Sequence, residues 1–235
     1  MPFYYGTFDL TSLLFMLPGI LLAAWAQAKV SGNFNKYSRV QSAHCITGAE
    51  AARRILNENG LSYVAIQHVS GELSDHYDPR SKVVRLSDEV FNSTSLAAVA
   101  VAAHECGHAI QDAEEYQPMR WRSAIAPAAS VATQAAWAIL LIGFVLSMYG
   151  LAMIGALLFG VVVLFQLVTL PVEYNASSRA LSILEAEGIL ESSEVGGAKK
   201  VLSAAALTYV ASLVAAIVSF LNIMRMIIMY RRNRW

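Results

Sequence analysis

The sequence predicts a mainly α-helical integral membrane protein with about four transmembrane helices and a small α+β domain at the membrane surface. Of its 235 residues, 56% are hydrophobic and only 14% are charged, whereas charged residues make up about a quarter of an ordinary soluble domain. Long apolar segments alternate with polar ones along the chain. The 17 basic and 17 acidic residues cancel, so no overall field favours nucleic acid or an acidic partner.

The first apolar segment, residues 10–28, carries no charge. It is long enough to cross the hydrocarbon core of a bilayer, with a kink expected at Pro18-Gly19. A signal peptide cleaved after residues 26–28 is the competing interpretation, but the segment lacks a basic n-region and its apolar run is long for an h-region. Three basic residues follow closely, Lys29, Lys36 and Arg39. Their position favours a cytoplasmic location for the next part of the chain.

Residues 30–122 are polar enough to form a water-facing domain. Within them, Thr47 and Glu50 have the spacing of a capping box, in which each side chain bonds the backbone amide of the other residue. Asn59-Gly60 supplies a C-terminal stop. The two signals predict a short helix over residues 47–59.

Two strands are expected after this helix. Residues 62–69 alternate in polarity and residues 82–86 are rich in valine, and both patterns are typical of strands. Residues 75–80 contain the Asp and Pro of a turn. An exposed strand edge beside a metal site can hold an extended peptide by backbone hydrogen bonds, and a merely supporting sheet is the alternative. The residues expected to form this substrate strand are Lys82, Val83, Val84, Arg85 and Leu86.

A metal-binding helix is predicted over residues 96–115. His104 and His108 lie four residues apart, and because an α-helix turns by about 100° per residue, both can reach one metal ion from one face. Glu105 is offset from that axis, so its carboxylate can hold a metal-bound water without taking a coordination position. This is the general-base arrangement of the H-E-x-x-H motif. A chance match is the alternative interpretation.

The surroundings of the motif support a buried helix. Ser93 or Ser95 can cap its start, and five alanines before His104 allow neighbouring elements to pack closely. Cys106 is expected to be a small buried residue. Asp112, four residues past His108, is either a hydrogen-bonding partner of the metal site or a solvent-facing residue.

The next two apolar segments, residues 124–148 and 151–170, carry no charge and are separated by Tyr149-Gly150. They predict a transmembrane hairpin, which returns the chain to its starting side. Glu173 then emerges in the same compartment as the metal helix. Catalytic zinc sites usually use three protein ligands plus water, so Glu173 is the expected third ligand. The rival interpretations are a surface glutamate and the use of His76 instead.

The last part of the chain raises a conflict over topology. Gly188 and Gly196-Gly197 predict a short helix followed by a loop, and residues 201–224 predict the fourth span. If the large domain is cytoplasmic, a crossing helix would leave the basic tail outside, against the positive-inside tendency. A short or re-entrant last helix is the alternative. The tail residues are Arg231, Arg232 and Arg234. The expected parts of the chain are residues 1–29, 30–122, 123–171, 172–200 and 201–235.

Three stretches, SDHYDPRSKVVRLS, AAVAVAAHECGHAIQDAEEY and PVEYNASSRAL, resemble the YugP-type neutral zinc metallopeptidases of bacterial membranes and, more distantly, the HtpX-type and CAAX-prenyl membrane proteases. With the flanking apolar segments, the likeness covers nearly the whole chain. It implies a zincin-like, gluzincin domain in which His104, His108 and Glu173 bind one Zn²⁺ and Glu105 activates water. In one respect the chain departs from the wider gluzincin pattern. Ser177 stands where those enzymes commonly have an Asp that orients a ligand, and a hydroxyl adds no charge there.

The function expected from these residues is zinc-dependent hydrolysis of peptide bonds, with Glu105 as general base. His76, Tyr174 and Arg179 are candidates for stabilising the oxyanion. The expected substrate is a peptide or a membrane protein, and the expected location is the bacterial plasma membrane with the catalytic domain in the cytoplasm. The alternative function is a membrane scaffold whose zinc site is structural and closed by four ligands. A transporter is disfavoured because the spans carry no acidic or basic residue before Arg225.

Overall fold

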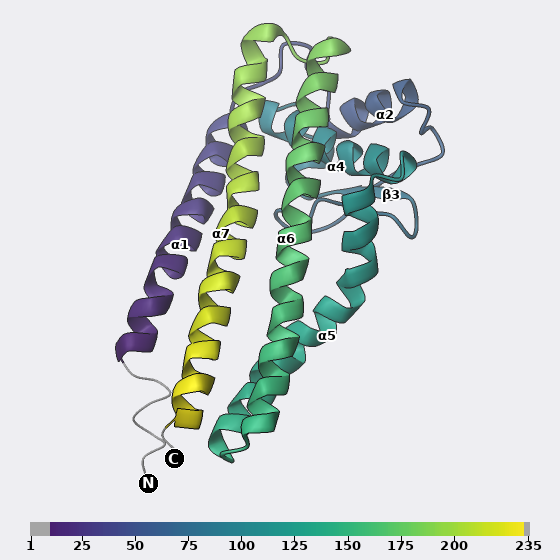
Figure 1. Ribbon diagram of the computed structural model, residues 1–235. Helices are drawn as coiled ribbons and strands as arrows, with labels where there is room; N and C mark the ends of the chain where they lie inside the picture. The colour runs from purple at the N-terminus through teal and green to yellow at the C-terminus, as the bar shows by residue number, and fades with distance from the viewer. Residues whose placement is uncertain (1–9, 233–235) are drawn as a thin grey trace. The chain divides into compact units, whose positions relative to one another are not determined.

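The computed structural model describes residues 10–232 (Figure 1). Residues 1–9 of the first predicted part and Arg234 of the basic tail lie outside the described residues. The protein is mainly helical, with one small sheet. In chain order the elements are α1 (Leu10–Tyr37), α2 (Gly48–Glu58), β1 (Ala65–His68), β2 (His76–Asp78), β3 (Val83–Leu86), α3 (Asp88–Phe91), α4 (Leu96–Ala113), α5 (Gln117–Val145), α6 (Tyr149–Ala186) and α7 (Ser192–Arg232).

The described residues form two compact units. Unit 1 consists of residues 10–25, 121–170 and 209–232, and unit 2 consists of residues 26–120 and 171–208. Each of the long helices α1, α5, α6 and α7 contributes one part of its length to each unit. Unit 1 is therefore a bundle of helix segments alone. Unit 2 contains the sheet and the three short helices together with the remaining ends of the long ones.

Four helices of the described chain are long and apolar enough to cross a membrane, judged by length and composition: Thr11–Tyr37, Gln117–Val145, Tyr149–Ala186 and Ser192–Met229. Within unit 1 their contacts use small residues. Backbone atoms of Ala215 on α7 lie where a Cβ on Gly19 would be crowded, and Gly143 meets the backbone of Ala152 in the same way. Large apolar side chains such as Leu157 and Val131 remain exposed. Small residues inside and large apolar ones outside are typical of helices that pack in lipid.

Unit 2 is built around α4. Its core is one cluster in which alanines 97, 98, 100, 102 and 103 of α4 are fully buried. These short side chains let α2 pack closely against α4. The capping box of α2 is present at Thr47 and Glu50, and Ser95 caps α4 by accepting from the Ala98 amide. Cys106 is buried, as expected for a small core residue.

The sheet has the order β1-β3-β2. β3 is central, parallel to β1 through the pair Ile66 and Val84 and antiparallel to β2 through the pair Tyr77 and Val84. The prediction that Lys82, Val83, Val84, Arg85 and Leu86 form an exposed substrate strand is therefore wrong for the centre of this segment. Val83, Val84 and Arg85 pair with β1 on one side and with β2 on the other. The cause is β2, which forms within residues 75–80, where only a turn was expected.

Three other features of the helices differ from the sequence-based expectations: the α5–α6 turn, residues 196–197 and the length of the last helix. The turn between α5 and α6 lies at residues 146–148, and Tyr149-Gly150 already belongs to α6. No loop forms at Gly196-Gly197. Both residues are helical in α7, and a Cβ on Gly197 would lie 2.5 Å from Leu96 Cδ2, so a larger residue there would require the Leu96 side chain to move. The last helix is uninterrupted over 41 residues, so the alternative of a short last helix is wrong.

Candidate metal centre

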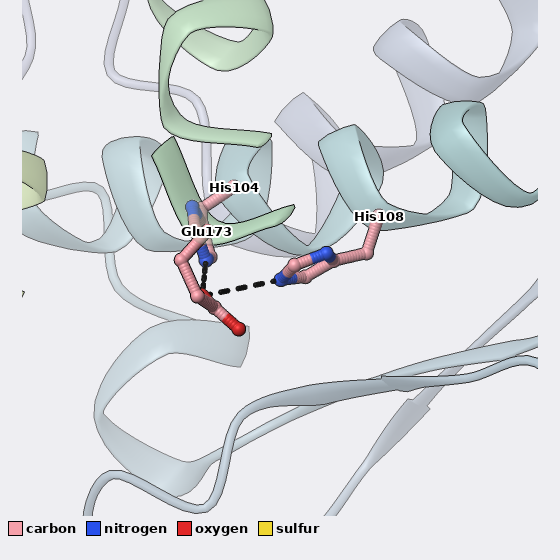
Figure 2. A group of neighbouring side chains, drawn as sticks. All are labelled: His104, His108 and Glu173. Carbon is pink, nitrogen blue, oxygen red and sulfur yellow. Dashed lines mark hydrogen bonds and ion pairs between the residues drawn. The ribbon is translucent and has the colours of Figure 1, made fainter. Parts of the chain in front are cut away.

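The side chains of His104, His108 and Glu173 converge between α4 and α6 (Figure 2). His104 Nε2 lies 3.2 Å from Glu173 Oε2, and His108 Nε2 lies 3.6 Å from the same oxygen. One ligand atom from each residue falls within 4.8 Å of the others. His108 and Glu173 are buried and His104 is partly buried. The three ligands predicted from the sequence are thus brought together by two helices from distant parts of the chain.

A close backbone approach makes this convergence possible. Gly107 lies between the two histidines on α4, and Ala176 lies one turn past Glu173 on α6. A Cβ on Gly107 would come within 2.7 Å of the Ala176 carbonyl oxygen. Only glycine leaves room for α6 at this point, so the position of Glu173 relative to the histidines depends on the absence of a side chain at residue 107.

Each histidine is held at its Nδ1 atom by a neutral polar side chain. Ser177 Oγ lies 3.1 Å from Nδ1 of His104, and Gln111 Oε1 lies 3.0 Å from Nδ1 of His108. Metal-binding histidines usually donate one ring N–H to such a partner, which leaves the other nitrogen for the metal. Both Nε2 atoms therefore face Glu173 with the orientation that metal ligands need.

This donor set fits a zinc ion. Two imidazole nitrogens and one carboxylate are a common set of ligands for catalytic zinc, with a further position left for water or substrate. The Glu173 side chain is only 2% exposed. Burying a carboxylate is costly without a compensating positive charge, and a divalent cation between the three side chains would supply one.

Glu105 follows His104 on α4 and is buried, at 7% exposure. Burial raises the pKa of its carboxyl to about 7, against the opposing influence of His104 and with a contribution from the charge of Glu173. The backbone of Tyr77 in β2 favours the charged form of this carboxyl and so opposes the rise in its pKa. β2 packs against α4, the helix that carries the residue predicted to be the base.

The remaining predicted site residues have other partners. Asp112 Oδ2 accepts from the Tyr77 hydroxyl at 2.7 Å and from Lys82 Nζ at 2.5 Å, so it joins the sheet to α4 and does not contact a ligand histidine. Arg179 donates to Asn175 at 2.8 Å. Of the two remaining oxyanion candidates, Tyr174 is half-exposed and His76 contacts the Ser74 carbonyl.

Sequence reasoning missed the polar residues that position the ligands. Gln111 is fully buried, and its amide nitrogen donates to the Val172 carbonyl at 2.8 Å and to Asn175 Oδ1 at 2.9 Å. Its position three residues after His108, on the same helix face, was the available signal. Asn175 and Tyr77 could not be found from their spacing to a histidine, because they come near the site only through tertiary contacts.

Comparison with known proteins agrees with the geometry. The family described as "Putative neutral zinc metallopeptidase" matches residues 12–231. The chain is 47% identical over 213 residues to "Putative membrane protease YugP" of Bacillus subtilis (strain 168), which covers 91% of this chain and 93% of that protein. No solved structure matches the chain.

Replacing Gly107 with Ala should displace α6 and separate Glu173 from the histidines. We expect the Gly107→Ala protein to lose zinc and to be destabilised by about 1–3 kcal/mol, as overpacked cores are, measured by metal analysis and thermal unfolding in detergent. Gly196→Ala is the matched control, because it is also helical and has no atom within 4 Å of a new Cβ. That control should gain up to about 1 kcal/mol. A Gly107→Ala protein with full zinc and normal stability would contradict the role of this approach.

Proposed function

This chain belongs to the family described as "Putative neutral zinc metallopeptidase", and we propose that it is a membrane-embedded zinc-dependent endopeptidase with Glu105 as general base. The observation that carries the proposal is the convergence of His104, His108 and Glu173 beside a buried carboxylate one residue from the first ligand. Metal, base and edge strand would then meet within unit 2.

The proposed roles follow from the positions of the side chains. His104, His108 and Glu173 would hold one Zn²⁺. When bound there, zinc would supply Lewis acidity, which polarises a scissile carbonyl and makes water a nucleophile at neutral pH. Glu105 would take the proton from the attacking water and pass it to the leaving amine nitrogen. Ser177 and Gln111 would keep the histidine rings in place.

Glu105→Gln separates binding from chemistry. The amide keeps the size of the side chain but cannot accept the proton, so we expect unchanged zinc content and a loss of peptide hydrolysis of at least about 100-fold, the lower range for general-base catalysis. Zinc is measured by metal analysis and hydrolysis with a quenched fluorescent peptide. His104→Ala and His108→Ala are the comparison variants and should lower zinc content as well. A fully active Glu105→Gln protein would refute the assignment of the base.

A structural zinc site in a membrane scaffold is the second candidate function. Structural sites are closed by four protein ligands, whereas catalytic sites keep one position open. The candidate group in the described chain contains three ligands, and Glu105 lies next to them. Three protein ligands leave a position for water on a bound zinc ion, and a neighbouring carboxylate can deprotonate that water in hydrolysis. A structural site does not need such a base. These features favour the enzyme.

Because β3 is the central strand of the sheet, the free edge of β2 is a better candidate for substrate binding than β3. β2 pairs with β3 on one side only, and it packs against α4, the helix that carries Glu105 and both histidines. A peptide added along this edge would lie beside the base and the metal ligands. Asp112 would hold the edge in place through Tyr77 and Lys82. We therefore propose that substrate binds by strand addition to β2.

Strand addition predicts that only every second backbone amide of the substrate contributes to binding. In a peptide that the wild-type protein cleaves, N-methyl groups placed on successive backbone amides should raise KM at alternate positions only, because successive amides of a strand point to opposite sides. Each lost hydrogen bond should weaken binding by about 1 kcal/mol, roughly fivefold. The measurement is a KM series on single N-methylated peptides. A uniform effect, or none, would contradict binding along a strand edge.

Aromatic residues suggest where the membrane surface lies. Trp25 and Trp121 are the residues of α1 and α5 at which unit 1 gives way to unit 2, and Tyr209 has the same place on α7. Trp25 and Trp121 are both exposed. Trp and Tyr are enriched at membrane–water interfaces. Glu173 comes three residues after Leu170, the last residue of unit 1 on α6, which is about one helical turn. We propose that the zinc site lies at the membrane surface.

We propose that unit 2 lies on one side of the membrane. The start of α1, the turn between α5 and α6 and the end of α7, which all belong to unit 1, would then lie on the other side. We place unit 2 in the cytoplasm from the basic residues near its helix ends. A fluorescent protein that matures only in the cytoplasm should be dark at either terminus and bright when inserted at Gly71, in an exposed loop of unit 2. Fluorescence from a terminal fusion would contradict this orientation.

A further inference from the structure

Gln111 is a polar side chain with no exposure to solvent, placed three residues after His108 on α4. Burying an amide costs free energy unless its donors and acceptor are paired. The Gln111 amide has a partner at each atom: His108 at its oxygen, and Val172 and Asn175 at its nitrogen. Val172 and Asn175 flank Glu173 on α6. One side chain therefore touches one ligand directly and holds the segment that carries another.

The direction of each hydrogen bond in this group can be assigned. Arg179 has only donors, so the atom of Asn175 that faces its Nε at 2.8 Å must be the amide oxygen. The same oxygen and the Val172 carbonyl, which can only accept, both face the Gln111 amide group. The Gln111 nitrogen must therefore lie on that side, with both of its hydrogens used. Its oxygen must then face His108.

This assignment determines the protonation of the His108 ring. The Gln111 oxygen can only accept, so Nδ1 of neutral His108 must carry the proton across the 3.0 Å contact. Nε2 then presents a lone pair toward Glu173 Oε2, 3.6 Å away. A lone pair facing a carboxylate oxygen is repulsive unless a cation lies between them. His104 differs, because the Ser177 hydroxyl can donate or accept and so does not select one form of the ring.

We infer that Gln111 is a positioning residue that locks His108 in its Nδ1-protonated tautomer and couples it to the Glu173 segment of α6. The inference rests on the zinc site of the proposed function but not on peptidase activity. Arg179 has a part in the same arrangement, because it orients Asn175 and is itself held by Glu114 at 2.6 Å. Arg179 thus orients the Asn175 side chain, Asn175 orients Gln111, and Gln111 orients the His108 ring.

The tautomer can be observed directly in the metal-free protein. The chain has five histidines, so ¹⁵N-histidine labelling gives a simple spectrum, in which His108→Ala identifies the His108 signals. In mildly alkaline buffer the wild-type protein should show His108 only with the proton on Nδ1. Gln111→Met keeps the side-chain length without hydrogen bonds, so the Nε2-protonated form should appear. Its zinc affinity, measured by competition with a chelator, should fall about 10–100-fold.

Gln111→Glu tests the two contacts separately. The carboxylate still accepts from His108 but can no longer donate to Val172 or Asn175, so the tautomer should persist while zinc affinity falls. Gln134→Met, the same change at an exposed position of α5, is the control and should alter neither quantity. A His108 ring that stays purely Nδ1-protonated in Gln111→Met, or an undiminished zinc affinity, would overturn the inference. If Gln111→Met does not fold, wild-type zinc affinity in Gln111→Glu would overturn it. A wild-type protein that binds zinc but hydrolyses no peptide would count only against the proposed function.

Discussion

The candidate metal centre depends on how closely the backbones of α4 and α6 approach each other. At Gly107 no side chain separates α4 from the Ala176 carbonyl, and the three ligands meet across this gap. Packed helices lie about 8–10 Å apart, depending on the side chains at the contact, and a glycine at the crossing allows a close approach. The alanines of α4 have the same effect elsewhere in unit 2, because their short side chains let α2 pack closely against α4.

This close packing leaves little room for water, so the polar groups in it must satisfy one another. Gln111 of α4 does so with Asn175 of α6, Arg179 does so with Asn175, and Ser177 does so with His104. Removing one partner of such a buried group costs about 1–3 kcal/mol. The polar network therefore contributes both to stability and to the orientation of the ligands. It holds each imidazole by its Nδ1 atom and directs both Nε2 atoms to the same point.

The sheet contributes through its edge. β3 is enclosed between β1 and β2, and β2 packs against α4, the helix that carries Glu105. The contact of Tyr77 and Lys82 with Asp112 fastens this edge to α4 one turn beyond His108. Two of the three ligand residues and Glu105 thus lie on the helix that this edge contacts, whereas Glu173 comes from α6. In the proposed function, the fixed edge strand would hold a peptide beside the metal centre.

The sequence by itself determined the features that depend on neighbours along the chain. The spans follow from runs of apolar residues, the cap of α2 from Thr47 and Glu50, and the metal pair from two histidines one helical turn apart. Glu173 could be predicted as the third ligand because a hairpin returns the chain to its starting side. Only the tertiary structure decided the order of the strands, the partners of Asp112 and the role of Gln111. Those depend on pairing between residues far apart in the chain, which no local pattern encodes, and on an approach of α4 and α6 that a single glycine permits.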